Sequence, residues 1–204
     1  MNQRFVYFDL GKVLVHFDHE TAVLQLSQLA GRPADLVRQV VFASDLQNQY
    51  ETGLVTGDEF AAQVNLGLES DLPPADILQA ISDIFSPNLS ILAAIELVRA
   101  ADIPLGILSN TCEAHWQWIA RQAWPMFGPW WSQTILSYQV QGMKPAAKIY
   151  EVCEQRAGCR GADIFFTDDR AENVAAASHR GWQTSLYTSS DQLLDDLGHW
   201  LNGT

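Results

Sequence analysis

The chain has 204 residues, of which 48% are hydrophobic, and a formal net charge of −12 at pH 7. This hydrophobic content is typical of a folded globular protein and excludes a disordered chain. Nucleic acids and anionic membranes bind basic surfaces, so the acidic balance argues against both as partners. The length allows one hydrophobic core, either alone or with a modest inserted subdomain.

The three cysteines, Cys112, Cys153 and Cys159, show no metal-ligand spacing and are expected to be ordinary thiols in a reducing compartment. No basic and apolar leader precedes Phe5, and no apolar run approaches membrane-spanning length. We therefore expect a cytoplasmic protein. The sequence leaves open whether the protein is a monomer or a homodimer.

The first predicted element is a strand over residues 4–9, an apolar run that ends at an aspartate. Residues 19–86 then show apolar side chains at helical spacing and no convincing strand. Within them, Thr56 and Glu59 form a capping-box pattern, and Pro73–Asp76 begins another helix. That helix is predicted to bury one face, formed by Ile77, Ile81, Ile84 and Phe85.

After residue 87, strands and helices alternate. Strands are predicted over 103–108, 134–137, 163–167 and 183–186. Such alternation indicates a parallel sheet with helices on both faces. We predict an α/β fold, with a Rossmann-like, doubly wound core at 1–17 and 87–204 and a small helical cap at 18–86. A cap inserted directly after the first strand would cover the site as a lid.

Four polar segments fall at predicted strand ends, on the side where α/β sheets bind ligands. Asp9 ends the first strand, and the Ser109–Thr111 turn can cradle a phosphate with its hydroxyl and amide groups. Lys144 can place a point charge on an anion. The adjacent carboxylates of Asp168 and Asp169 suit a hard cation such as Mg²⁺.

Each segment alone also has a purely structural interpretation. An aspartate at a strand end is often only a helix N-cap, a Ser-Asn-Thr turn is often only a turn, and a single lysine is often solvated surface. Their order and placement together are much less expected by chance. The four segments are therefore interpreted as one site.

In this order, the segments resemble the haloacid dehalogenase-like hydrolase superfamily over nearly the whole chain. The resemblance implies that Asp9 is the catalytic nucleophile. It also implies that Ser109, the Asn110 amide and Lys144 bind the phosphoryl oxygens and stabilise their charge, with Ser109 and Lys144 counted as catalytic. Tyr50–Gly53 resembles the signature turn of the small cap found in this superfamily.

The same resemblance implies a Mg²⁺ site. Its expected ligands are Asp9, the backbone carbonyl of Gly11, and the pair Asp168 and Asp169, of which Asp169 is the expected direct ligand. The cation would screen the negative charges of nucleophile and phosphate, which otherwise repel each other. Gly11 can provide this carbonyl although it has no side chain.

Gly11 stands where members of the superfamily usually carry a second aspartate, which protonates the leaving oxygen. Acid–base help of this kind is worth about 10²–10⁴-fold in rate. The substrate could have a better leaving group, such as a sugar 1-phosphate or an acyl phosphate. Alternatively, His16 or Asp18 could replace the acid, or the protein could bind a phosphometabolite with little or no turnover.

Asp-Leu-Gly at residues 9–11 resembles the α-D-glucose-1-phosphate phosphatase-type subgroup, in which Asn or Gly usually takes the position of Lys12. Lys12 is expected to point outward rather than toward the phosphate.

We predict a Mg²⁺-dependent phosphatase that hydrolyses a small phosphorylated metabolite through an aspartyl-phosphate on Asp9. The alternatives are a catalytically weak phosphometabolite-binding relic and a metal-free 2-haloacid dehalogenase. A dehalogenase also uses an aspartate nucleophile, but it has no use for two acids at Asp168 and Asp169, and it normally carries an aromatic residue in place of Gly11. The sequence does not name the substrate.

Overall fold

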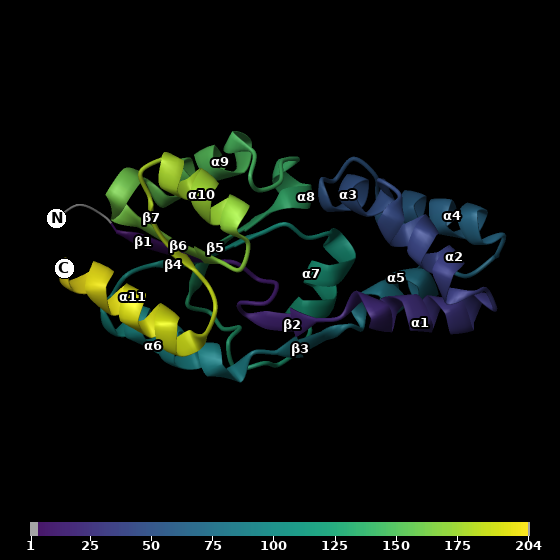
Figure 1. Cartoon of the computed structure of the whole chain (residues 1–204), viewed down its shortest axis with the longest axis horizontal. Helices are drawn as coiled ribbons and strands as arrows, with labels where there is room; N and C mark the ends of the chain where they lie inside the picture. Colours follow the sequence, from purple (N-terminus) through teal and green to yellow (C-terminus); the bar gives the residue numbers. More distant parts are fainter. Residues whose placement is uncertain (1–3, 204) are drawn as a thin grey trace.

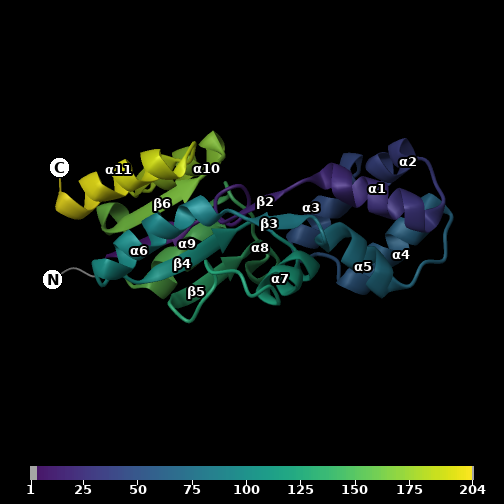
Figure 2. The ribbon, with the colours of Figure 1, turned by 90° about the horizontal axis from the view of Figure 1, so that it is seen from below.

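The computed structural model describes residues 4–203, which form two lobes joined by a pair of short strands (Figure 1). One lobe, the core lobe, contains a five-stranded sheet between two layers of helices. The other, the cap lobe, is built of the helices α1 to α5. Figure 2 shows the short strands β2 (Val15–Phe17) and β3 (Phe85–Pro87) between the two lobes.

The sheet has the strand order β5-β4-β1-β6-β7, and all of its neighbouring strands pair in parallel. Its strands are β1 (Phe5–Phe8), β4 (Leu105–Ser109), β5 (Trp131–Leu136), β6 (Ile164–Asp168) and β7 (Gln183–Leu186). The helices of this lobe are α6 (Leu92–Ala100), α7 (Glu113–Ala120), α8 (Ser137–Val140), α9 (Ala147–Ala157), α10 (Ala171–His179) and α11 (Ser190–Asn202), with short 3₁₀ turns at Leu89–Ile91 and Gly161–Asp163. The predicted α/β fold with a Rossmann-like parallel sheet is confirmed.

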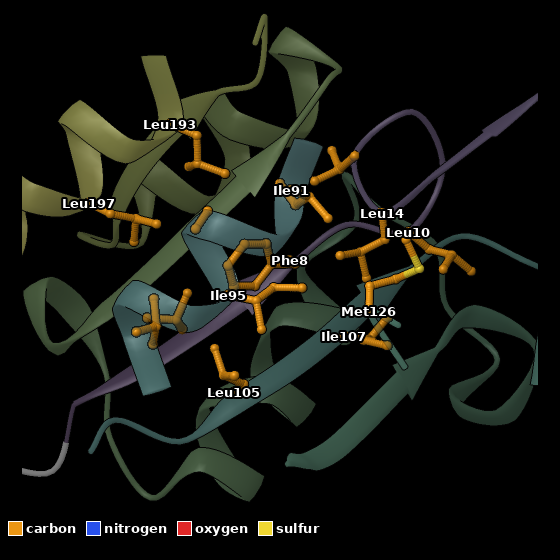
Figure 3. Close-up of a cluster of buried hydrophobic side chains, with 14 of the residues drawn as sticks. Phe8, Leu10, Leu14, Ile91, Ile95, Leu105, Ile107, Met126, Leu193 and Leu197 are labelled. Carbon is orange, nitrogen blue, oxygen red and sulfur yellow. The ribbon is translucent and has the colours of Figure 1, made fainter. Parts of the chain in front are cut away.

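The central strand β1 is buried on both faces. Val6 and Phe8 belong to one hydrophobic cluster. Figure 3 shows Phe8 of this cluster with Ile95 of α6 and Leu193 of α11. The alternate residues of β1 face α9 and α10 in a second cluster. Burying each large apolar side chain stabilises the fold by about 1.5–3 kcal/mol, so this strand holds the residue at its carboxyl end, Asp9, in a fixed position.

The cap lobe has its own hydrophobic cluster, which includes Leu26, Phe60 and Ile81. Its helices are α1 (His19–Ala30), α2 (Ala34–Arg38), a π-helical turn (Gln39–Ala43), α3 (Leu46–Glu51), α4 (Gly57–Leu68) and α5 (Pro74–Ser82). The predicted capping box of Thr56 and Glu59 forms at the start of α4. No helix in the described part of the chain is long and apolar enough to cross a membrane.

One prediction for this region was wrong. Residues 19–86 were expected to contain no strand, and Phe85 was expected on a helix face. Instead, α5 ends at Ser82, and β3 pairs antiparallel with β2, so that Phe85 lies opposite Phe17. Three-residue strands are too short to show a period of two in the sequence, which explains the error.

Residues 50–53, at the end of α3, contact the core lobe one after another. The Ala114 backbone N–H donates a hydrogen bond to the Tyr50 hydroxyl at 3.2 Å. The Ser137 hydroxyl donates to the Glu51 carbonyl at 2.6 Å. These contacts hold the cap lobe against the ends of β4 and β5.

Gly53 lies close against the backbone of the core lobe. Its φ of +72° is in the left-handed region, and a Cβ built on it would lie 2.2 Å from the Tyr138 carbonyl oxygen. Only glycine fits such a contact without displacing backbone. The neighbouring Thr52 hydroxyl donates to the Met143 sulfur at 2.9 Å. The signature turn predicted from the sequence therefore lies directly on the core lobe.

Candidate active site

Asp9 directly follows β1 at the carboxyl edge of the sheet. Its backbone N–H donates to the Thr167 carbonyl at 2.9 Å, which aligns it with β6. Its side chain is 9% exposed and accepts a hydrogen bond from Lys144. Burial raises the pKa of the Asp9 carboxyl above its usual range, Lys144 opposes this effect, and the neighbouring Asp168 adds to it. The nucleophile predicted from the sequence is thus a buried, ion-paired carboxylate.

Lys144 reaches three oxygens from its buried position. Its Nζ lies 2.7 Å from Asp9 Oδ1, 2.6 Å from Asp168 Oδ2 and 3.0 Å from the Leu108 carbonyl oxygen. Burial alone would lower the pKa of Lys144, but the two carboxylates raise it above its usual range. The ammonium group therefore stays charged and joins the two aspartates.

Lys144 was predicted at a strand end, and that detail was wrong. Strand β5 ends at Leu136, and α8 lies between this strand and the loop that carries Lys144. The long side chain covers the remaining distance to the sheet edge. The loop is fixed by other contacts, which involve Asn110.

Asp168 is the last residue of β6 and is fully buried. Besides Lys144, its carboxylate accepts hydrogen bonds from Asn173 Nδ2 at 3.0 Å and from the Arg170 backbone N–H at 2.8 Å. These donors engage both of its oxygens. Asp168 therefore orients Lys144 and the start of α10.

Asp169 is more exposed than Asp168 and lines the cavity described below. Carboxylate oxygens of Asp9, Asp168 and Asp169 lie within 4.8 Å of one another. Burial raises the pKa of Asp169, and Asp168 adds to the shift. Three clustered carboxylates are a donor set that suits a hard divalent cation, which fits the predicted Mg²⁺ site.

Lys12 does not simply point outward as expected. Its side chain is 60% exposed, yet its Nζ lies 3.6 Å from Asp169 Oδ2. Its φ of +59° is in the left-handed region, which non-glycine residues rarely adopt. The Asn or Gly expected at this position would fit that backbone more easily.

Ser109 and Asn110 lie where β4 ends. The Ser109 hydroxyl is buried and donates to the Asn110 carbonyl at 3.2 Å. The Asn110 side chain donates to the Lys144 carbonyl at 2.9 Å and accepts from the Lys144 backbone N–H at 2.8 Å. The side chain of Asn110 thus fixes the lysine loop, while its backbone amide is the group predicted to bind phosphate.

Gly11 lies in the turn after Asp9, and the ring of Phe17 lies beside it. A Cβ on Gly11 would lie 2.8 Å from Phe17 Cε1. The Phe17 ring also lies next to those of His19 and Phe85, with centroids 5.0 and 5.9 Å away. The space in which a second aspartate would begin is therefore occupied by an aromatic ring.

A cavity of about 410 Å³ opens between the two lobes. From the core lobe and β2 it is lined by Asp9, Gly11, Lys12, Phe17, Asn110, Met143, Lys144, Asp169, Arg170 and Asn173. From the cap lobe it is lined by His19, Asn48 and Glu51. A second cavity of about 50 Å³ is lined by five of these residues and by Ser109, among others. Apart from the fully buried Asp168, the predicted phosphate and metal residues thus line one or both of these cavities.

Comparison with known proteins gives both phosphatase and dehalogenase relatives. The chain is 24% identical over 191 residues to a D-ribitol-5-phosphate phosphatase from Bacteroides thetaiotaomicron, covering 88% of this chain and 89% of the relative. It is 26% identical over 136 residues to an (S)-2-haloacid dehalogenase from Pseudomonas putida, covering 65% of this chain and 58% of that protein. No family model matches the sequence.

Solved structures share the whole fold. A HAD family enzyme from Bacteroides thetaiotaomicron, in complex with magnesium and inorganic phosphate, matches with a TM-score of 0.79 at 22% identity, covering 92% of this chain and 96% of that one. The chain is thus similar in sequence and in fold to proteins of the haloacid dehalogenase-like hydrolase superfamily. An L-2-haloacid dehalogenase from Xanthobacter autotrophicus, a more distant match, gives a TM-score of 0.62 at 18% identity, covering 90% of this chain and 76% of that one.

The two residues suggested as substitutes for the missing acid, His16 and Asp18, lie outside both of these cavities. His16 is exposed on β2 and lines neither of these two cavities, although it borders a separate one with Lys12 and Asp169. Asp18 accepts a hydrogen bond from the Glu20 backbone N–H and caps α1. The ionisable side chains that do reach the cavities from the cap lobe are His19 and Glu51, which sequence reasoning missed.

Proposed function

We propose that the protein is a Mg²⁺-dependent phosphatase that hydrolyses a small phosphorylated metabolite. The observation that carries this proposal is the cluster of Asp9, Asp168 and Asp169, whose carboxylate oxygens lie within 4.8 Å of one another beside the buried Lys144. The relative named as a phosphatase and the HAD family structure with magnesium and phosphate support it.

In this proposal, Asp9 attacks phosphorus, and the bond to the leaving oxygen breaks. Water then hydrolyses the aspartyl-phosphate and releases inorganic phosphate. Ser109, the Asn110 amide and Lys144 stabilise the charge on the phosphoryl oxygens. Asp9 approaches an anion with less repulsion because the Lys144 ammonium lies 2.7 Å from it.

The expected metal ligands are Asp9, Asp169 and the Gly11 carbonyl. Asp168 acts through Lys144 and Asn173, because their donors already engage its carboxylate. When bound, Mg²⁺ supplies the positive charge that screens nucleophile and phosphate from each other.

We also propose that residues 18–86 act as a cap that selects the substrate, and that 1–17 and 87–204 form the catalytic core. The cap lobe has its own hydrophobic cluster and contributes His19, Asn48 and Glu51 to the cavity. A sugar 1-phosphate remains our preferred substrate class. Its leaving hydroxyl is more acidic than an ordinary alcohol, which suits a site with glycine at position 11.

A 2-haloacid dehalogenase is the second candidate. It is favoured by the match to the Pseudomonas putida enzyme and by the aromatic ring of Phe17 beside Gly11. The carboxylate cluster counts against it, because such an enzyme needs no cation and gains nothing from Asp169.

The experiment is a Mg²⁺-dependent assay of p-nitrophenyl phosphate, with (S)-2-chloropropionate as a parallel substrate. We expect phosphate release that stops with a chelator and falls by more than ~10³-fold in Asp9→Asn. Thermal unfolding of the variant controls for folding, since asparagine has the same shape. Chloride release from chloropropionate without Mg²⁺ would replace the proposal by the second candidate. Turnover that is unchanged in Asp9→Asn would exclude both mechanisms.

A further inference from the structure

We propose that Glu51 of the cap lobe is the general acid and base of this site, in the role that Gly11 leaves empty. The inference rests on the proposed phosphatase function. It assigns a catalytic group to the cap lobe, whereas the nucleophile and the predicted phosphate ligands belong to the core lobe.

The position of Glu51 carries the inference. Glu51 lines both cavities of the site, and the wall common to the two also contains Gly11, Phe17, His19 and Asn110. The large cavity contains the nucleophile, and the small one lies against Gly11. Glu51 thus borders the space beside the position that lacks an acid.

The backbone around Glu51 is held against the core lobe. The Glu51 carbonyl accepts a hydrogen bond from the Ser137 hydroxyl at 2.6 Å, and Ser137 in turn accepts from the Thr111 backbone N–H at 2.9 Å. Two residues further, Gly53 lies against the Tyr138 carbonyl. A proton donor needs such a fixed position to reach a leaving oxygen.

Burial is the largest influence on the Glu51 carboxyl, and it favours the protonated form. Its Oε1 accepts a hydrogen bond from Gln47 Nε2 at 2.7 Å. Burial raises the pKa of the Glu51 carboxyl, while the Gln47 bond and Arg170 act in the opposite direction. The other charged or titratable side chains around the same cavity are Asp9, Lys12, His19, Lys144 and Asp169. A carboxyl with a raised pKa is a better proton donor near neutral pH.

The step balances without any further reactant. In the first half, Asp9 forms a bond to phosphorus, the bond to the leaving oxygen breaks, and the Glu51 carboxyl gives its proton to that oxygen. In the second half, the Glu51 carboxylate takes a proton from water, whose oxygen attacks phosphorus and releases Asp9. Glu51 ends protonated, as it began.

His19 is the competing group in the same wall. His19 is an exposed residue, but part of its ring is buried, and this partial burial lowers the pKa of the imidazole. At neutral pH its ring therefore holds a proton less often than a free histidine does, which makes it a weak donor. Substituting His19 and Glu51 one at a time shows which of the two side chains donates the proton.

The test compares an alkyl phosphate, glycerol 2-phosphate, with p-nitrophenyl phosphate, whose leaving group needs little acid help. In Glu51→Gln we expect kcat for the alkyl phosphate to fall about 10²–10⁴-fold and kcat for the aryl phosphate to fall less than about threefold. The decrease of alkyl-phosphate kcat at alkaline pH should also disappear in this variant. Glu113→Gln, the same change at an exposed glutamate of α7, is the matched control and should behave like wild type.

An equal fall on both substrates in Glu51→Gln would mean a structural role and would overturn the inference, as would no change. A selective loss of alkyl turnover in His19→Gln, with Glu51→Gln unaffected, would transfer the role to His19. A wild type that hydrolyses the aryl but not the alkyl phosphate would also overturn the inference. Failure of the wild type on both substrates would instead reject the proposed phosphatase function.

Discussion

The side chain of Asn110 and the backbone of Lys144 form two reciprocal hydrogen bonds, at 2.9 and 2.8 Å. They connect the end of β4 to the loop before α9. With the loop held in this way, the Lys144 ammonium reaches Asp9 and Asp168 in the centre of the sheet edge. Asn110 is therefore a positioning residue for the ammonium group of Lys144.

Replacing Asn110 by alanine should release the lysine loop. Each lost hydrogen bond contributes about 0.5–1.5 kcal/mol, so we expect the free energy of unfolding to fall by about 1–3 kcal/mol. Turnover of p-nitrophenyl phosphate should fall with it, mainly through kcat. Urea unfolding and steady-state kinetics measure the two effects. Asn48→Ala removes an exposed asparagine of the same cavity and should leave stability within about 0.5 kcal/mol.

Gly11→Asp is expected to add a second acid beside Glu51 only when the ring of Phe17 makes room. A Cβ at position 11 would lie 2.8 Å from that ring, and overpacking of this kind costs about 1–3 kcal/mol. The double variant Gly11→Asp/Phe17→Ala should therefore show a higher ratio of alkyl to aryl phosphate turnover than Gly11→Asp alone. Phe17→Ala serves as the control. Equal ratios in the single and double variants would contradict this steric explanation.

Lys12 should weaken binding of the cation. Its Nζ lies 3.6 Å from Asp169 Oδ2, and an exposed pair of this kind is worth about 0.2–1 kcal/mol. In Lys12→Asn, the half-saturating Mg²⁺ concentration should fall by up to about fivefold, and the difference from wild type should shrink at high salt. Asparagine also tolerates the left-handed backbone at this position. Lys148→Gln, at an exposed lysine of α9, should leave the Mg²⁺ titration unchanged.

His115 should make stability depend on pH. Burial lowers the pKa of this α7 histidine to about 4 from the usual 6.5. Between these values the unfolded state binds more protons than the folded state, so the contribution is present above pH 6.5 and lost as the pH falls toward 4. Between pH 7 and 4.5, wild type should lose about 2 kcal/mol more than His115→Gln in urea unfolding. Equal losses in the two proteins would contradict the buried, neutral ring; His179→Gln is the exposed control.

The core lobe could be predicted from sequence because its central strands β1, β4 and β6 are buried on both faces. Continuous apolar runs such as the one in β6 are typical of parallel strands, and the β7 boundaries at Gln183 and Leu186 were predicted correctly. Asp9, Ser109 and Asp168 follow from the same reasoning, because parallel strands bring their carboxyl ends to one edge.

The contribution of the cap lobe to the site could not be predicted in this way. The places of Phe17, His19 and Glu51 depend on how two separately folded clusters meet, and this is set by long-range contacts such as the one between Gly53 and Tyr138. Helical periodicity describes α3 alone and carries no information about the surface against which α3 packs.

The chain crosses between the lobes through β2 and β3, which pair Phe17 with Phe85 (Figure 2). A twist of this two-stranded ribbon that also broke the hydrogen bonds of Tyr50 and Glu51 to the core lobe would carry Glu51 away from Asp9 while leaving the ion pairs of Lys144 intact. If Glu51 holds the transferable proton, an open molecule would be chemically idle toward alkyl phosphates while its phosphate-binding groups stayed assembled. Binding and reaction would then be separate events in time, with closure between them.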